Sequence, residues 1–112
     1  MNRKQKKLLK SYLKYEDFLI EDLKENPKEA ELYLKSALKE YQEHKDDRVL
    51  LLALNHIAKV RGISAVAKDT HLTRQTIHRA LSPKGNPRFS TLTSIIHSLG
   101  YSLTFRHIRT NP

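Results

Sequence analysis

Residues 63–81 read ISAVAKDTHLTRQTIHRAL, and this stretch decides the expected fold. Ala67 is small at a point where two helices would have to approach closely. Val66, Leu72, Ile77 and Leu81 supply apolar contacts on either side of that crossing. A small residue flanked by apolar positions at this spacing is typical of two short helices joined by a tight turn. The stretch therefore predicts a helix-turn-helix.

The second helix of this unit is expected to begin at Thr73, whose hydroxyl can cap the free backbone N–H groups of the first turn. Arg is suited to bidentate contact with guanine and Gln to adenine, while Thr can reach a phosphate or a thymine methyl group. We therefore expect this helix to read DNA bases. The alternative is an ordinary pair of short helices with polar faces. The candidate contacts are Thr73, Arg74, Gln75, Thr76, His78 and Arg79.

The loop that follows, residues 82–89, is expected to support the same surface. Two prolines stiffen it and Gly85 permits a tight turn. Lys84 and Arg88 can then reach phosphates beside the second helix. Phe89 is expected to anchor the loop to the core.

Charge is distributed unevenly along the chain. Residues 1–14 carry six basic residues and no acid, a net charge of +6. Residues 15–47 carry eleven acids and five lysines, a net charge of −6, and residues 48–112 carry ten basic residues and only one acid, Asp69. A nearly acid-free region around the helix-turn-helix is the electrostatic pattern expected of a phosphate-binding surface.

The remaining helices are indicated by caps and by apolar spacing. An apolar group at residues 18–23 ends near Asn26, and Asn26 with Pro27 is expected to begin the next helix. Asp46 or Asp47 should cap a third helix that stops at Gly62, and a last helix is expected over residues 91–99, capped by Ser90. The chain is thus predicted to be mainly α, with five or six short helices.

After Gly100 the period changes to alternation, which favours a half-buried strand over residues 101–108. No second strand is readable, so the simplest partner is the same strand of a second copy, giving a symmetric dimer. An extended tail packed on the helices by its aromatic residues is the alternative. The expected dimer contacts are Tyr101, Leu103 and Phe105.

Length and composition exclude several classes of protein. The 112 residues fit one compact domain, with a basic arm at 1–14, acidic helices at 15–47, the helix-turn-helix at 48–100 and the strand at 101–108. With no cysteine, a thiolate metal site cannot form, and the six histidines show no metal-ligand spacing. No catalytic constellation is readable. We expect no enzyme activity, metal, cofactor or membrane segment, and a cytoplasmic location.

Three stretches together resemble the HigA-like addiction-module antidote proteins, which carry a Cro/XRE-type helix-turn-helix. They are YEDFLIEDLKENPKEAELYLKSAL, HIAKVRGISAVAKDTHLTRQTIHRAL and the NPRFSTL loop, and the resemblance spans roughly residues 15–105. The basic arm lies outside it. The family's turn usually has glycine where this chain has His71, so a left-handed backbone with some strain is expected there.

The resemblance implies an antitoxin that neutralises a small RelE-like toxin and represses its own operon by binding operator DNA. The alternatives are a stand-alone helix-turn-helix repressor without a toxin partner and a nonspecific nucleic-acid binder. Because RelE-like toxins are usually basic, the acidic segment is the hypothesised toxin surface. The alternative is that its acids only keep two helices soluble. The candidate toxin contacts are Glu21, Asp22, Glu25 and Glu29.

Overall fold

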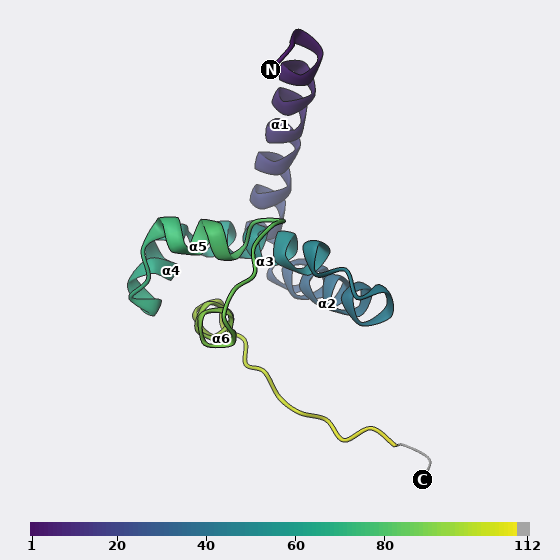
Figure 1. The fold of residues 1–112 in the computed structure, drawn as a ribbon, viewed down its shortest axis with the longest axis vertical. Helices are drawn as coiled ribbons and strands as arrows, with labels where there is room; N and C mark the ends of the chain where they lie inside the picture. Colours follow the sequence, from purple (N-terminus) through teal and green to yellow (C-terminus); the bar gives the residue numbers. More distant parts are fainter. Residues whose placement is uncertain (110–112) are drawn as a thin grey trace.

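The computed structural model describes residues 1–109, and within that range it is entirely helical apart from turns and a C-terminal tail (Figure 1). The expectation of a mainly α fold is confirmed, and the upper of the two expected helix counts is found in the described range. The helices are α1 (Arg3–Glu25), α2 (Pro27–His44), α3 (Asp47–Arg61), α4 (Ile63–Thr70), α5 (Arg74–Ala80) and α6 (Phe89–Ser98).

Local sequence signals place most helix boundaries. Pro27 is the first residue of α2, directly after Asn26, and Asp46 caps α3 by accepting a hydrogen bond of 3.0 Å from the Arg48 backbone N–H. Gly62, at φ 102°, separates α3 from α4. The start of α6 differs from expectation: the helix begins at Phe89 after Arg88, so Ser90 lies inside the helix and is not its cap.

The first helix is longer than the sequence indicated. The basic stretch 1–14 was expected to be a separate arm, but residues 3–14 form the first half of α1. A capping box fixes its start: Gln5 N–H donates to the Asn2 side chain at 2.8 Å, and Asn2 N–H donates to the Gln5 side chain at 3.0 Å. Figure 1 shows this half of α1 standing clear of the other helices.

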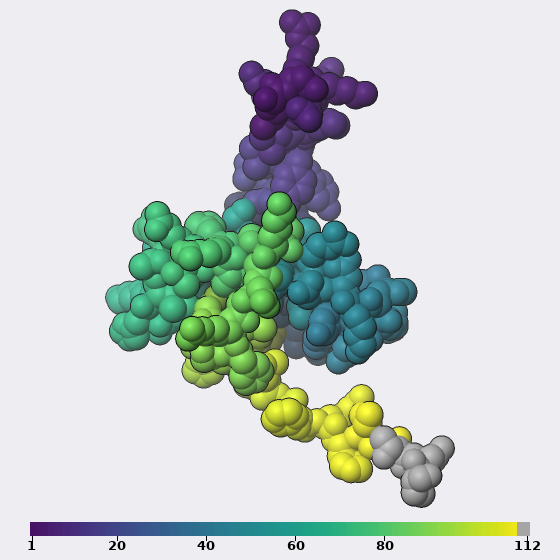
Figure 2. All heavy atoms as spheres, in the orientation of Figure 1, coloured from purple at the N-terminus to yellow at the C-terminus, as the bar shows by residue number. Residues whose placement is uncertain are grey.

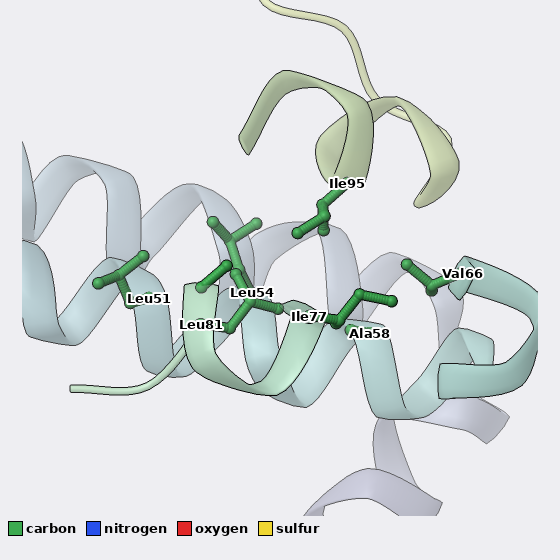
Figure 3. Packing of buried hydrophobic residues seen from close by; sticks show 8 residues of the cluster. Leu51, Leu54, Ala58, Val66, Ile77, Leu81 and Ile95 are labelled. Carbon is green, nitrogen blue, oxygen red and sulfur yellow. The ribbon is translucent and has the colours of Figure 1, made fainter. Parts of the chain in front are cut away.

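The main core lies between α3, α4, α5 and α6 (Figure 3). Leu54 of α3 packs with residues that the helix-turn-helix pattern had placed inside: Val66, Ile77 and Leu81. Ile95 of α6 closes the cluster and has no exposed surface. These side chains contain no polar atoms, so burial of apolar surface stabilises this cluster.

A smaller cluster joins α1 to α2 and α3 through Leu23, Ala30 and Ile57. Beside it lies a group that we call the polar seam: Glu16, Tyr33, His56 and Lys59. Glu16 is hydrogen-bonded to Lys59, and its other carboxylate oxygen lies 3.6 Å from His56 Nε2. His56 Nδ1 lies 2.6 Å from the Tyr33 hydroxyl. Glu16 and His56 are both buried, so an ionic and hydrogen-bonded contact fastens α1 to the body.

Burial and charge act against each other in the seam. Burial would raise the pKa of Glu16, but hydrogen bonds from Lys59 and Tyr12 outweigh it and hold that pKa below its usual value. Burial lowers the pKa of His56, and the nearby Glu16 carboxylate only partly opposes that effect. The seam therefore favours an ionised Glu16 beside a neutral His56.

The predicted C-terminal strand is wrong for this structure: residues 101–109 form no strand and run away from the body as an extended tail (Figures 1 and 2). A strand needs a hydrogen-bonded neighbour, and the described part of a single chain offers none. Tyr101 packs against the α1–α2 cluster, while Phe105 is fully exposed. The alternative, an extended tail packed on the helices by its aromatic residues, therefore holds only for Tyr101.

The prediction for Phe89 is also wrong. Its side chain is 71% exposed at the start of α6 and anchors nothing in the core. The core positions of α6 are Leu92, Ile95 and Ile96, which lie one helical turn or more further on. Phe89 is the first residue of α6 and lies three residues before the first core position, Leu92.

Among the described residues, no single helix has the length and apolar composition needed to cross a membrane. Helices α3 and α4 meet such a test only together, across a bend of 97°.

Candidate nucleic-acid interface

Helices α4 and α5 are joined by a three-residue turn, residues 71–73, as expected from the sequence. His71 has φ 60° and ψ 22°, so the left-handed backbone expected at this non-glycine position is present. The turn is held by side chains on both sides. Thr70 donates to the Val66 carbonyl at 2.7 Å and accepts from Leu72 N–H at 3.2 Å.

Thr73 caps α5, as expected: its hydroxyl accepts a hydrogen bond of 3.0 Å from the Thr76 N–H. The same hydroxyl lies 2.9 Å from the Thr76 hydroxyl. The hydroxyl groups of both threonines are thus already engaged in hydrogen bonds at the start of the helix. Thr76 is also the only half-buried member of the candidate set on this helix, so we rank these two behind their neighbours as base contacts.

The other candidate side chains on α5, Gln75, His78 and Arg79, are exposed, and so is Arg74. Ile77 and Ala80 bury the opposite face, so the helix presents one polar side to solvent. Arg74 is not free: its guanidinium donates to the hydroxyl of Ser64, in the first turn of α4. Sequence reasoning overlooked Ser64, because the two residues are ten positions apart and only the turn brings them together.

The loop after α5 folds back over the end of that helix. Gly85 N–H donates to the Ser82 carbonyl at 2.8 Å. A Cβ atom at Gly85 would lie 2.5 Å from the Ala80 carbonyl oxygen, so this close approach requires glycine. A groove of about 290 Å³ runs between α5 and residues 86–88, and Arg79 and Arg88 line it. Lys84 and Arg88 are both exposed beside the polar side of α5.

The single acid of this region is already neutralised. Asp69 accepts hydrogen bonds from Arg61 at 2.9 Å and from the Ser98 hydroxyl at 2.8 Å, and these bonds lower its pKa. A carboxylate engaged in this way repels a neighbouring anion less. The surface around α5 therefore carries unopposed positive charge, as a phosphate-binding face requires.

The other predicted contacts lie elsewhere on the molecule. Glu21, Asp22 and Glu25 are exposed on the second half of α1, and Glu29 is exposed in the first turn of α2. The predicted dimer contacts are split, since Tyr101 is half-buried whereas Leu103 and Phe105 are exposed. Neither group belongs to the α4–α5 surface.

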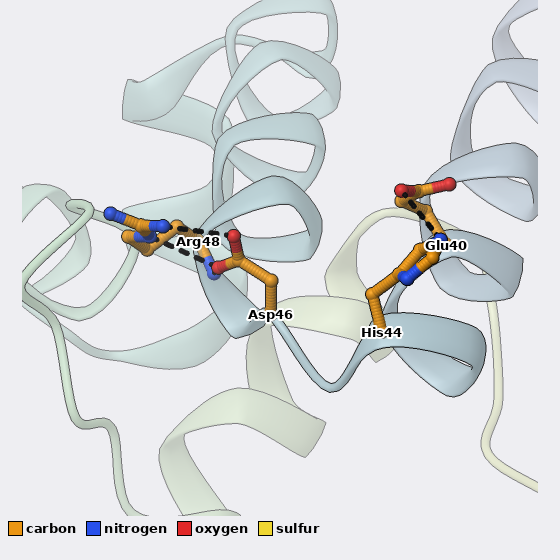
Figure 4. Close-up of polar contacts among 4 residues, drawn as sticks. All are labelled: Glu40, His44, Asp46 and Arg48. Atoms are coloured by element: carbon orange, nitrogen blue, oxygen red, sulfur yellow. Dashed lines mark hydrogen bonds and ion pairs between the residues drawn. The ribbon is translucent and has the colours of Figure 1, made fainter.

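One further polar group lies at the end of α2. One possible ligand atom from each of Glu40, Glu43 and His44 lies within 4.8 Å of the other two. All three are exposed, and the His44–Glu40 contact of 3.5 Å spans a single helical turn (Figure 4). Figure 4 also shows the separate Asp46–Arg48 pair that caps α3. Exposed groups of this kind are common on helices, and we assign no metal site here.

Comparison with known proteins adds a family. A family model described as "Probable addiction module antidote protein" matches residues 14–107. An uncharacterised protein of Haemophilus influenzae is 30% identical over 93 residues, which cover 83% of this chain and 92% of that protein. No solved structure gives a significant match. Since the family model covers all helices except the first half of α1, this chain belongs to the family of probable addiction module antidote proteins.

Proposed function

We propose that this protein is the antitoxin of a two-protein addiction module, which neutralises a RelE-like toxin and represses its own operon through a helix-turn-helix. Family membership supports the antitoxin role and a toxin partner in general. The exposed polar side of α5, capped by Thr73 and bordered by unopposed cations, supports the DNA-binding role. A cytoplasmic location goes with this role and stays a prediction.

In this proposal α5 is the recognition helix. Arg74 and Gln75 stand at its start, where side chains reach base edges, and His78 and Arg79 follow one turn later. Ser64 holds the Arg74 guanidinium and so limits the directions from which it can approach a base. Lys84 and Arg88 contact phosphates and fix the position of the helix without reading sequence.

Competition binding with a preferred operator and scrambled duplexes tests the readout. Arg74→Ala or Gln75→Ala should cost about 1–3 kcal/mol at the preferred site and reduce discrimination between sequences. Arg88→Ala should weaken all sequences alike. Arg48→Ala, at an exposed cation that is paired with Asp46 at the start of α3, is the matched control and should change neither quantity. Unchanged specificity in both recognition-helix variants would exclude this readout.

The toxin surface is proposed on the exposed acids Glu21, Asp22, Glu25 and Glu29. A basic toxin would be attracted to this side and repelled by the DNA-binding side, so the two activities should be separable. Reversing the four charges should slow association with the toxin at low salt while leaving operator binding intact. Equal association rates for the variant and the unaltered protein would move the toxin interface elsewhere.

The second candidate function is a stand-alone repressor without a toxin, and the third is a nonspecific nucleic-acid binder. Co-expression with the product of the adjacent gene distinguishes the first two, since a stable complex is expected only for an antitoxin. Salt dependence distinguishes the third, because a nonspecific binder would follow charge alone and show little sequence preference. A homodimer is part of the proposal. Leu103 and Phe105 of the tail stay the predicted site of one contact between copies.

A further inference from the structure

Helix α1 carries a stripe of exposed apolar side chains. Leu8, Tyr15 and Phe18 are 64%, 62% and 75% exposed, the highest values among the apolar residues of this helix. Another face of the helix, with Glu16 and Leu23, is buried against the rest of the chain. The molecule thus leaves aromatic and aliphatic surface uncovered along a helix that its own capping box holds in shape.

The stripe continues to both ends of the helix with alternating spacings of four and three residues. This is the heptad pattern by which one helix packs along another. Its charge changes along the helix, from a lysine at the start, through apolar and small residues, to two acids at the end. The stripe consists of Lys4, Leu8, Ser11, Tyr15, Phe18, Asp22 and Glu25, all exposed.

We propose that this stripe binds the same stripe of a second copy, with the two α1 helices antiparallel around a two-fold axis near residue 13. In that register Leu8 lies opposite Phe18 of the second copy, and Ser11 lies opposite Tyr15. Lys4 lies opposite Asp22 of the second copy, with Lys7 and Glu21 beside that pair. Each contact occurs twice, as in any isologous interface.

The charge pattern favours a second copy over other occupants. Residues 1–14 carry +6 and residues 15–25 carry five acids and one lysine, a net −4. An antiparallel pair places each basic half beside an acidic half, whereas a parallel pair would place like charges together. Nucleic acid would suit only the basic half, and a basic protein only the acidic half. The whole stripe is complementary to itself.

The shape of the molecule leaves room for this contact. Figure 2 shows the first half of α1 projecting from the body, and every residue of the stripe is exposed. In this register residues 3–23 of the two helices overlap, so the paired helices could be in contact over about 30 Å at 1.5 Å per residue. The α4–α5 surface is not involved.

This pairing does not rest on the proposed function, although Asp22 is also a proposed toxin contact. Its test uses the whole chain alone, without toxin or DNA, so its failure would leave toxin binding and DNA reading, as proposed above, untouched. Sedimentation equilibrium should show a reversible dimer. Phe18→Glu should raise the dimer dissociation constant by at least about tenfold. Leu32→Glu, at a residue 61% exposed on α2, should leave it unchanged. A monomeric unaltered protein, or a Phe18→Glu variant that dimerises equally well, would overturn the proposal.

Charge reversal tests the register without touching the apolar centre. Lys4→Glu with Lys7→Glu should weaken the dimer, and so should Glu21→Lys with Asp22→Lys. All four substitutions in one chain restore opposite charges across the two-fold axis and should recover dimerisation. If the quadruple variant stays as weak as its parents, the antiparallel register is wrong.

Cysteine cross-linking tests the orientation, since the natural chain has no cysteine. A mixture of Leu8→Cys and Phe18→Cys chains should form a mixed disulfide on oxidation, and neither variant alone should cross-link efficiently. Self-linking of each variant would indicate a parallel pair and contradict the proposal. Truncation after Gly100 should leave cross-linking in place. Its loss would assign the contact between copies to the tail.

Discussion

The core of helices α3–α6 and the polar seam that fastens α1 are built differently. Leu54, Ile77 and Ile95 bury apolar side chains completely, so the core depends on shape and volume. The seam instead buries Glu16 against Lys59 and His56, so it depends on charge state and hydrogen bonds. Apolar packing keeps its strength as the pH falls, whereas a buried ionic contact is lost once its carboxylate is protonated. The proposed DNA-binding surface is thus built on the part of the molecule that is less sensitive to pH.

The largest effect should come from the core. Ile77→Ala removes a side chain with no exposed surface from the centre of the α3–α6 cluster and should lower the free energy of unfolding by about 2–5 kcal/mol. Urea denaturation measures the change. Leu103→Ala, at a residue 54% exposed in the tail, is the control and should change stability by less than about 0.5 kcal/mol. Similar losses in both variants would mean that the core is not where stability resides.

A smaller effect is expected in the seam. Glu16→Leu removes the carboxylate that pairs with Lys59 and should cost about 1–3 kcal/mol. The loss is limited because Lys59 is 32% exposed and can turn towards water. Hydrogen exchange should show faster opening of residues 16–25 while the α3–α6 core stays protected.

The double variant Glu16→Leu with Lys59→Met separates charge from packing. It leaves no charge of this pair buried, so it should recover much of the stability that Glu16→Leu loses. If the double variant is as unstable as the sum of the two single ones, the ion pair makes no net contribution and packing alone holds α1.

These two regions also differ in how well the sequence predicts them. Val66, Ile77 and the Thr73 cap follow local spacing rules and are confirmed in the structure. The seam joins residues 43 positions apart, and no periodicity connects Glu16 with Lys59. The helix start at Arg3 was missed because the lysines of residues 1–14 suggested an arm, although Asn2 and Gln5 form a capping box.

The candidate interface shows the same division. Local capping and turn chemistry predicted where α5 begins. Of the five side chains expected to face solvent, all are exposed except Thr76, which is half-buried. Two contacts that shape the surface, Ser64 with Arg74 and Asp69 with Arg61, depend on how α4 is placed and have no local signal. The prediction of a strand in the tail was wrong because alternating apolar residues indicate only that a segment has two different faces. They do not show that a neighbouring strand exists.

Lowering the pH should weaken the seam before the core. The lowered pKa of His56 means that the unfolded chain binds this proton more readily than the folded one. The contribution of the neutral His56 ring to folding stability is therefore fully present above the pKa of the unfolded chain, about 6.5. It is lost as the pH falls below that value. The slope cannot exceed about 1.4 kcal/mol per pH unit for one proton.

Denaturation between pH 7.5 and 5 measures this slope. His56→Gln removes the titrating group beside Glu16, Tyr33 and Lys59 and should flatten the profile. His97→Gln, at an exposed histidine of α6, is the control and should not. The ionic contact of Glu16 is lost only at a lower pH, because the pKa of Glu16 lies below its usual value of 4.5. An unchanged slope in His56→Gln would assign the pH dependence to other groups.

The smallest effect concerns backbone strain in the part of the molecule that is otherwise held by apolar packing. His71 ends α4 with φ 60°, a conformation that costs a residue with a side chain about 1–2 kcal/mol. Glycine removes this cost but gains freedom in the unfolded chain, worth about 0.4–1 kcal/mol against folding. His71→Gly should therefore stabilise the protein by a few tenths to about 1 kcal/mol, while His71→Ala should not. Lys45→Gly, at φ 59° after α2, is a matched test of the same geometry away from the proposed DNA-binding surface. If only Lys45→Gly stabilises, the His71 side chain contributes to the turn between α4 and α5 and offsets its own strain.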